Sequence, residues 1–195
     1  RDRELDGRKE TFQELVQKGL GGFLVRNMES YGILDTMGLT SRIVLDANIY
    51  TMNNRAEAFW MKKGILGDTV PLELNAKELV HRNNKNSELT VYGYTPMMVS
   101  VQCVQKTMDH CNHACVQYVL KDRYQKEFRG VCSCEFCYNT IYNTLPTSLL
   151  KEKEKAEKLG VKAYRLSFTT ETQQETEKIV RAFVDVYLRG QKPDG

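Results

Sequence analysis

The chain has 195 residues, a formal net charge of +3 at pH 7, 27% charged residues and 41% hydrophobic residues. This is the composition of an ordinary globular domain, and the chain is long enough to bury a core without disulfide cross-links. So small a charge does not by itself indicate a nucleic-acid-binding surface, which needs its Lys and Arg residues gathered on one face.

Membrane insertion and secretion also find no support in the sequence. No apolar run is long enough to span a bilayer, and neither a signal-peptide pattern nor an Asn-x-Ser/Thr glycosylation acceptor occurs. We therefore expect a cytoplasmic protein with no membrane partner. Because the chain begins at Arg1 rather than Met and runs directly into a helical pattern, we expect it to be a piece of a longer protein.

Short apolar runs alternate with helical periods along most of the chain. The runs that predict strands are 22–27, 42–50, 69–75, 89–94 and 163–169. Apolar residues at three- and four-residue spacing predict amphipathic helices between and after them, as in Ala56, Phe59 and Trp60. Two helix starts carry a capping residue followed by a carboxylate three positions later, namely Asn75 with Glu78 and Thr172 with Glu175.

This alternation predicts an α/β fold with a parallel sheet covered by helices. Five strand–helix units are more than half of an eight-unit barrel, which needs about 250 residues. We therefore predict one domain over 1–195 that is a portion of a (β/α) barrel, an incomplete TIM-type barrel with about five parallel strands. Its Cys-rich insertion is expected at 95–159. The first and last strands would be unpaired edges, so a homo-oligomer of this fragment is expected.

Polar residues alternate with apolar ones in the predicted strands. In 42–50 the apolar set Ile43, Leu45, Ala47 and Ile49 would face the helices, which turns Asp46 and Asn48 to the other face. The same reasoning selects candidate catalytic residues Asp46, Glu73 and Arg165, and candidate substrate-binding residues Arg26, Asn48, Asn75 and Tyr92. Ligand binding is one explanation of such inward polar groups. The other is a self-satisfied ion network, for example of Asp46 or Glu73 with Arg165.

All six cysteines lie between Cys103 and Cys137, and two of them form the Cys-x-x-Cys pair Cys134/Cys137. Two residues between paired cysteines let both sulfurs reach one metal, and thiolates are strong ligands for zinc and for iron–sulfur clusters. The spacing therefore favours a metal held by four thiolates and leaves the metal open. A disulfide framework and a redox dithiol are the alternatives.

The segment 92–103, Tyr-Gly-Tyr-Thr-Pro-Met-Met-Val-Ser-Val-Gln-Cys, together with Lys106-Thr107, Cys111, Lys121-Asp122-Arg123 and Cys134-Glu-Phe-Cys137-Tyr-Asn, resembles the U32 peptidase family, the collagenase-like proteases. It is most similar to the C-terminal barrel portion of the long clostridial-type members. The segments GFLVRN, LDANIYTMN, PLELNAKEL and YRLSFTTET are also similar to that family. One position departs from the pattern, because Pro96 stands where the shorter members carry a further cysteine.

The resemblance implies a β/α barrel whose first strands precede Arg1. It also implies that Cys103, Cys111, Cys134 and Cys137 are the metal ligands and that Cys115 and Cys132 are additions. Several relatives hold a four-iron four-sulfur cluster on four cysteines and hydroxylate transfer RNA, ribosomal RNA or a quinone precursor, whereas other members are described as proteases acting on collagen.

We therefore expect an iron–sulfur-dependent enzyme that modifies RNA or a small ring substrate, with zinc as the alternative metal. A U32-type peptidase acting on a peptide is the first alternative. The sequence has no His-Glu-x-x-His or Gly-x-Ser-x-Gly motif for it, although Cys111 with His113, or Cys103 with His81, are conceivable nucleophile–base pairs. His110 and His113 are equally interpretable as spare metal ligands. A structural zinc module that mediates assembly is the second alternative.

Overall fold

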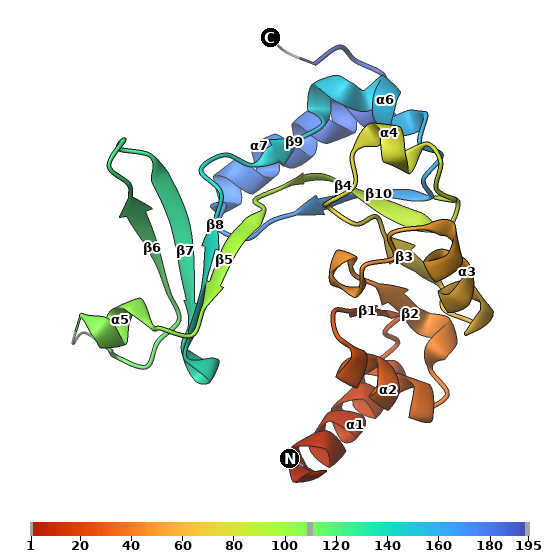
Figure 1. The fold of residues 1–195 in the computed structure, drawn as a ribbon, viewed down its shortest axis with the longest axis horizontal. Coiled ribbons are helices and arrows are strands. Elements are labelled where there is room, and N and C mark those ends of the chain that lie inside the picture. Colours follow the sequence, from red (N-terminus) through yellow and green to blue (C-terminus); the bar gives the residue numbers. More distant parts are fainter. Residues whose placement is uncertain (1, 109–110, 194–195) are drawn as a thin grey trace. The chain divides into compact units, whose positions relative to one another are not determined.

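A computed structural model describes residues 2–108 and 111–193, and the chain divides into two compact units (Figure 1). Unit 1 contains the described residues of 1–90 and 154–165. Unit 2 contains those of 91–153 and 166–195. Most of the predicted Cys-rich segment 95–159 therefore lies in unit 2, and its last residues, 154–159, lie in unit 1.

A parallel sheet with flanking helices confirms the mixed α/β class. The strands β1 (Phe23–Val25), β2 (Ile43–Leu45), β3 (Gly67–Thr69) and β4 (Ser87–Gly93) pair in parallel, and β10 (Ala163–Ser167) follows β4 in the sheet order. A short strand, β9 (Thr147–Ser148), pairs antiparallel with β4. In the described part of the chain this sheet is open, with β1 and β10 at its edges as predicted.

The helices of the described residues are mostly short, and two of them begin with the predicted capping boxes. They are α1 (Asp2–Gln17), α2 (Met28–Thr36), α3 (Asn54–Lys62), α4 (Ala76–Leu79), α5 (Val104–Thr107), α6 (Lys153–Glu157) and α7 (Gln173–Phe183). Asn75 with Glu78 caps α4, and Thr172 with Glu175 caps α7, each by the reciprocal side-chain and backbone bonds of a capping box. None of these helices has both the length and the apolar character needed to cross a membrane.

The core of unit 1 forms around the first two strands. Val25, Ile43 and Leu45 are almost fully buried and pack with Leu34 of α2 and Trp60 of α3. Ile43 and Leu45 are therefore on the helix-covered face, as the alternation in 42–50 predicts.

Two predicted strands are wrong in extent. The strand predicted at 69–75 is β3 at Gly67–Thr69, which ends before Pro71, a residue with no N–H for the ladder. The strand predicted at 42–50 ends at Leu45, because the Asp46 side chain accepts a hydrogen bond from the Ala47 N–H and starts the 3-10 turn Ala47–Ile49. Period-two alternation therefore does not apply to Asn48, Glu73 or Asn75, and all three are exposed.

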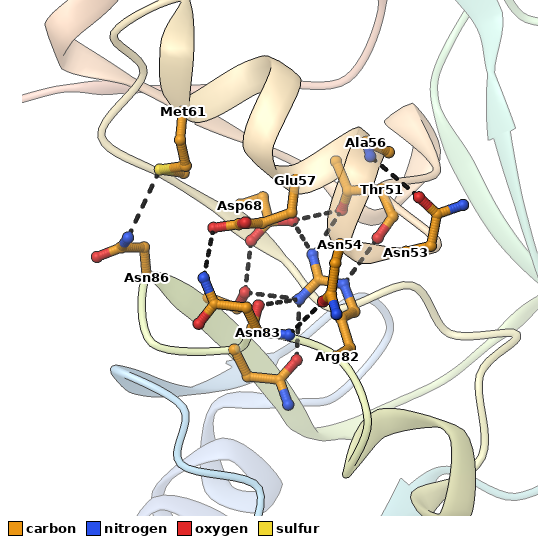
Figure 2. A network of polar contacts seen from close by, with 12 residues as sticks. Thr51, Asn53, Asn54, Ala56, Glu57, Met61, Asp68, Arg82, Asn83 and Asn86 are labelled. Atoms are coloured by element: carbon orange, nitrogen blue, oxygen red, sulfur yellow. Dashed lines mark hydrogen bonds and ion pairs between the residues drawn. The ribbon is translucent and has the colours of Figure 1, made fainter.

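A buried ion pair between Arg82 and Asp68, with further hydrogen bonds around it, connects β3, β4 and the segment before α3 in unit 1 (Figure 2). The side chains of Arg82 and Asp68 are 2% and 1% exposed, and the two groups are in direct contact. Arg82 also donates to the Thr51 carbonyl (2.8 Å), to Asn84 Oδ1 (2.9 Å) and to Ser87 Oγ (2.9 Å). Ser87 donates in turn to Asp68 Oδ1 at 2.6 Å.

Unit 2 is built on a four-stranded antiparallel sheet in the order β5-β8-β7-β6. Its strands are β5 (Pro96–Ser100), β6 (Val116–Lys121), β7 (Glu127–Ser133) and β8 (Tyr138–Tyr142). In the same unit Tyr92 is buried against Phe168 and against Phe183 of α7. The Tyr92 ring therefore packs among aromatic side chains of the same unit.

We expect Arg82→Met to destabilise the protein by about 3–5 kcal/mol, because it leaves the Asp68 carboxylate buried without its cation. The exposed Arg55 is a matched control, and Arg55→Met should change the free energy of unfolding by about 0.5 kcal/mol or less. Urea unfolding of both variants measures this difference. Equal stability of the two variants would contradict a structural role for the Arg82 network.

Candidate functional site

The antiparallel topology of unit 2 gathers the cysteines at one end of its sheet. Cys103 lies three residues beyond the end of β5, Cys115 immediately precedes β6, and Cys137 immediately precedes β8. The register pairs Ser100 with Asn139, Ser133 with Tyr138, and Val116 with Cys132, so these chain ends coincide in space. The label of α5 marks this end in Figure 1.

Three of the sulfurs form a buried group. Cys103, Cys132 and Cys134 are 5%, 0% and 7% exposed and pack together. The sulfurs of Cys103 and Cys132 are 3.6 Å apart. The backbone N–H of Lys106, at the start of α5, lowers the pKa of Cys103, whereas burial and then Cys103 itself raise the pKa of Cys132. The two thiols of this pair therefore differ in the direction in which their surroundings shift the pKa.

Cys134 also belongs to a second group, on the exposed side of the first. Ligand atoms of Cys111, His113 and Cys134 all lie within 4.8 Å of one another. The pKa of Cys134 is raised by burial first, then by Cys111, and further by Cys137 and Cys103. The other three predicted ligands therefore all interact electrostatically with Cys134; they are Cys103, Cys111 and Cys137.

The structure also brings Cys132 into the site, although the resemblance treats it as an addition. Alternation in β7 could have indicated this, because Gly130 and Cys132 share the buried face of the strand while Val131 and Ser133 take the other. Cys115 interacts with Cys132. All six cysteines are free thiols, so the structure contains no disulfide framework.

An aromatic ring lies against this thiol group because the position opposite it is glycine. Tyr118 in β6 pairs with Gly130 in β7, and a Cβ at Gly130 would overlap the Tyr118 ring. Tyr118 packs on the buried cysteines, and its hydroxyl is buried with no hydrogen-bond partner among the described residues. Burial raises the pKa of Tyr118, and Cys132 and Cys103 raise it further. A thiolate or sulfide here would give this hydroxyl an acceptor.

The donor set therefore fits a soft or borderline metal. Thiols supply most of the donor atoms, three of them are withdrawn from water, and one imidazole lies beside them. Zinc and iron–sulfur clusters both prefer such ligands.

A polar cluster in unit 1 joins residues that directly follow β1 and β2 to residues within β4 and β10. Arg165 of β10 donates from Nη1 to Asp46 Oδ1 at 2.9 Å and from Nη2 to Glu88 of β4. Arg26, which directly follows β1, holds Asp46 Oδ2 at 2.9 Å. Arg165 and Asp46 are 20% and 12% exposed in their side chains, while Arg26 is 62% exposed.

Three predicted site residues thus meet, and the other four, Asn48, Glu73, Asn75 and Tyr92, do not join them. Asp46 pairs with Arg165, which is the contact expected if these groups form a self-satisfied ion network, and Arg26 adds a second cation to Asp46. Glu88 is not among the residues selected from the sequence, because the predicted strand 89–94 starts one residue after it, whereas β4 starts at Ser87. Glu73 forms no ion pair with this cluster in the part of unit 1 that is described, Asn75 caps α4, and Asn48 is exposed in its 3-10 turn.

Comparisons with protein-family models, with curated proteins and with solved structures give no match to this chain.

We expect Gly130→Ala to destabilise the protein by about 1–3 kcal/mol, because the added methyl group forces the Tyr118 ring away from the cysteines. Gly32→Ala in α2 is the control: nothing lies within 4 Å of the added methyl, and alanine favours the helix by up to about 1 kcal/mol. Thermal unfolding of both variants checks the difference. A Gly130→Ala variant as stable as the control would contradict the close packing of Tyr118.

Proposed function

We propose that the chain is part of a U32-type enzyme that uses an iron–sulfur cluster to hydroxylate RNA or a related ring-bearing substrate. The single observation that carries the proposal is the convergence of the cysteines on Cys134 at one end of the unit 2 sheet. The resemblance of the sequence motifs to the U32 family supplies the reaction class. In this proposal the parallel strands β1–β4 belong to a (β/α) barrel of the TIM type that further strands complete, and the protein acts in the cytoplasm.

In this proposal Cys103, Cys111, Cys134 and Cys137 hold a four-iron four-sulfur cluster. Such a cluster supplies one-electron chemistry when bound. The chain itself supplies two features of the cluster's surroundings. One side of the site contains little water, because Cys103, Cys132 and Cys134 are buried. The Tyr118 hydroxyl is available as a hydrogen-bond donor. Hydrogen bonds to sulfur and exclusion of water are two of the means by which a protein sets the reduction potential of a cluster.

Unit 1 would bind and orient the substrate through the polar cluster around Asp46. Arg26 and Arg165 hold the Asp46 carboxylate from two sides, which fixes its position. The guanidinium of Arg26 remains largely accessible, and this group suits a phosphate oxygen of RNA because it is planar, permanently charged and carries several N–H donors.

The peptidase alternative has less geometric support. A carboxylate pair that activates water shares a proton between two unpaired acids. Asp46 and Glu88 instead both contact the arginine that lies between them. A structural zinc module keeps one specific observation in its favour, the imidazole of His113 beside two thiols.

We expect the anaerobically purified chain to be brown and to contain iron and sulfide, and Cys134→Ser to lose most of both, because Cys134 lies at the centre of the group. Metal analysis and visible absorption measure this. Cys115→Ser is the comparison and should retain its metal. Colourless, zinc-containing protein would contradict the iron–sulfur proposal, and equal loss in Cys115→Ser would contradict the ligand set.

We expect Asp46→Asn to abolish RNA modification by the full-length protein while lowering its stability by only about 1 kcal/mol, since the pair is partly hydrated. Glu73→Gln is the comparison, because Glu73 is exposed and outside the cluster. Thermal melts and a modification assay on substrate RNA, with gelatin cleavage as the assay for the peptidase alternative, read out the two effects. A loss of about 3–5 kcal/mol with full activity in the folded fraction would show that the Asp46 cluster is purely structural.

A further inference from the structure

His113 lies where a ligand of the metal centre would lie. Its imidazole and the sulfurs of Cys111 and Cys134 are within 4.8 Å of one another, so a single ion placed among the three atoms can contact each of them. Within residues 2–108 and 111–193 this is the one group of three possible ligands drawn from His, Cys, Asp and Glu that comes so close together.

The local backbone explains how Cys111 and His113 reach the same ion from positions only two residues apart. The Asn112 side chain accepts a hydrogen bond from the Ala114 N–H at 3.1 Å, which turns the chain. His113 itself takes a left-handed conformation, with φ of 56°. This conformation is uncommon for residues other than glycine, and histidine is among the side chains that adopt it more often.

Cys137 is placed less well to be a ligand, although it belongs to the Cys-x-x-Cys pair. Its thiol is exposed and donates toward the carbonyl oxygen of Cys134, with sulfur and oxygen 3.6 Å apart. Cys103, in contrast, is buried in the same packed group as Cys134. These contacts favour Cys103 over Cys137 as the remaining thiolate.

We infer that the metal centre has three thiolates and one imidazole, supplied by Cys103, Cys111, Cys134 and His113, with His113 in place of Cys137. The inference rests on the proposed metal centre and revises its four-cysteine ligand set at one position, because His113 lies with Cys111 and Cys134. Three cysteines and one histidine are a common set for tetrahedral zinc, and replacing cysteine by histidine on an iron–sulfur cluster raises its reduction potential. The residue types are therefore compatible with either metal, and the approach of three ligand atoms to within 4.8 Å of one another suits a single ion.

The test loads the metal-free 195-residue chain with Co²⁺ alone under anaerobic conditions, because tetrahedral Co²⁺ reports its ligands by visible absorption. We expect wild-type protein and Cys137→Ser to give the same charge-transfer intensity, that of three thiolates. His113→Ala should bind Co²⁺ at least about 10-fold more weakly. His113→Cys should restore the affinity and add the intensity of a fourth thiolate. Circular dichroism of each variant confirms that it is folded.

Unchanged Co²⁺ affinity in His113→Ala together with a lost thiolate in Cys137→Ser would overturn the inference and favour four cysteines. Wild-type protein that binds no Co²⁺ would overturn both this inference and the proposed metal centre. If Co²⁺ binding depends on His113 but the protein purified anaerobically carries zinc and no iron, the ligand assignment is supported and the iron–sulfur function is contradicted. The two failures are therefore distinguishable.

Discussion

The candidate metal site of unit 2 depends on one electrostatic constraint: several thiols lie close together in a space with little water. Thiolates gathered in a poorly hydrated space repel one another and lose solvation, and this drives up the pKa of Cys132 and Cys134. A bound cation reverses that effect, since it compensates several negative sulfurs at once and displaces their protons. Sheet topology enforces the crowding, because the ends of β5 and β7 and the starts of β6 and β8 share one end of the sheet.

Two arginine-centred clusters in unit 1 differ in how far they are exposed to water. The Arg82 network is closed: Asp68, Thr51, Asn84 and Ser87 satisfy one another inside the unit, and almost none of their surface reaches water. The Asp46 cluster is open on one side, because Arg26 pairs with Asp46 while most of its side chain remains exposed. Only the second arrangement leaves a charged group available to a ligand.

Much of the local structure could be predicted from the sequence, for identifiable physical reasons. The capping boxes at Asn75 and Thr172 are local hydrogen-bonding patterns and do not depend on distant contacts. The Asp46–Arg165 pair belongs to the ion-network alternative, which the sequence left open because a buried charge needs a partner. The places where strands stop were less predictable: Pro71 ends one run and the Asp46 side chain ends another, and period-two alternation carries no information beyond those points.

Other features depend on contacts that no sequence spacing reveals. Arg82 and Asp68 are distant in sequence and meet only after β3 and β4 pair. His113 meets Cys134 only after the unit 2 sheet has formed, so cysteine spacing alone pointed to Cys137. The role of Gly130 likewise becomes visible only when Tyr118 is found across the strand pair.

X-ray absorption at the metal edge of the anaerobically purified chain tests the central claim most directly, because it reports the atoms around the metal without relying on activity. We predict that the absorbing metal is iron, with sulfur in its first coordination sphere and a neighbouring iron atom, as in a cluster. A single zinc ion with no metal neighbour would contradict the cluster, and a coordination sphere of oxygen and nitrogen alone would contradict the thiolate site itself.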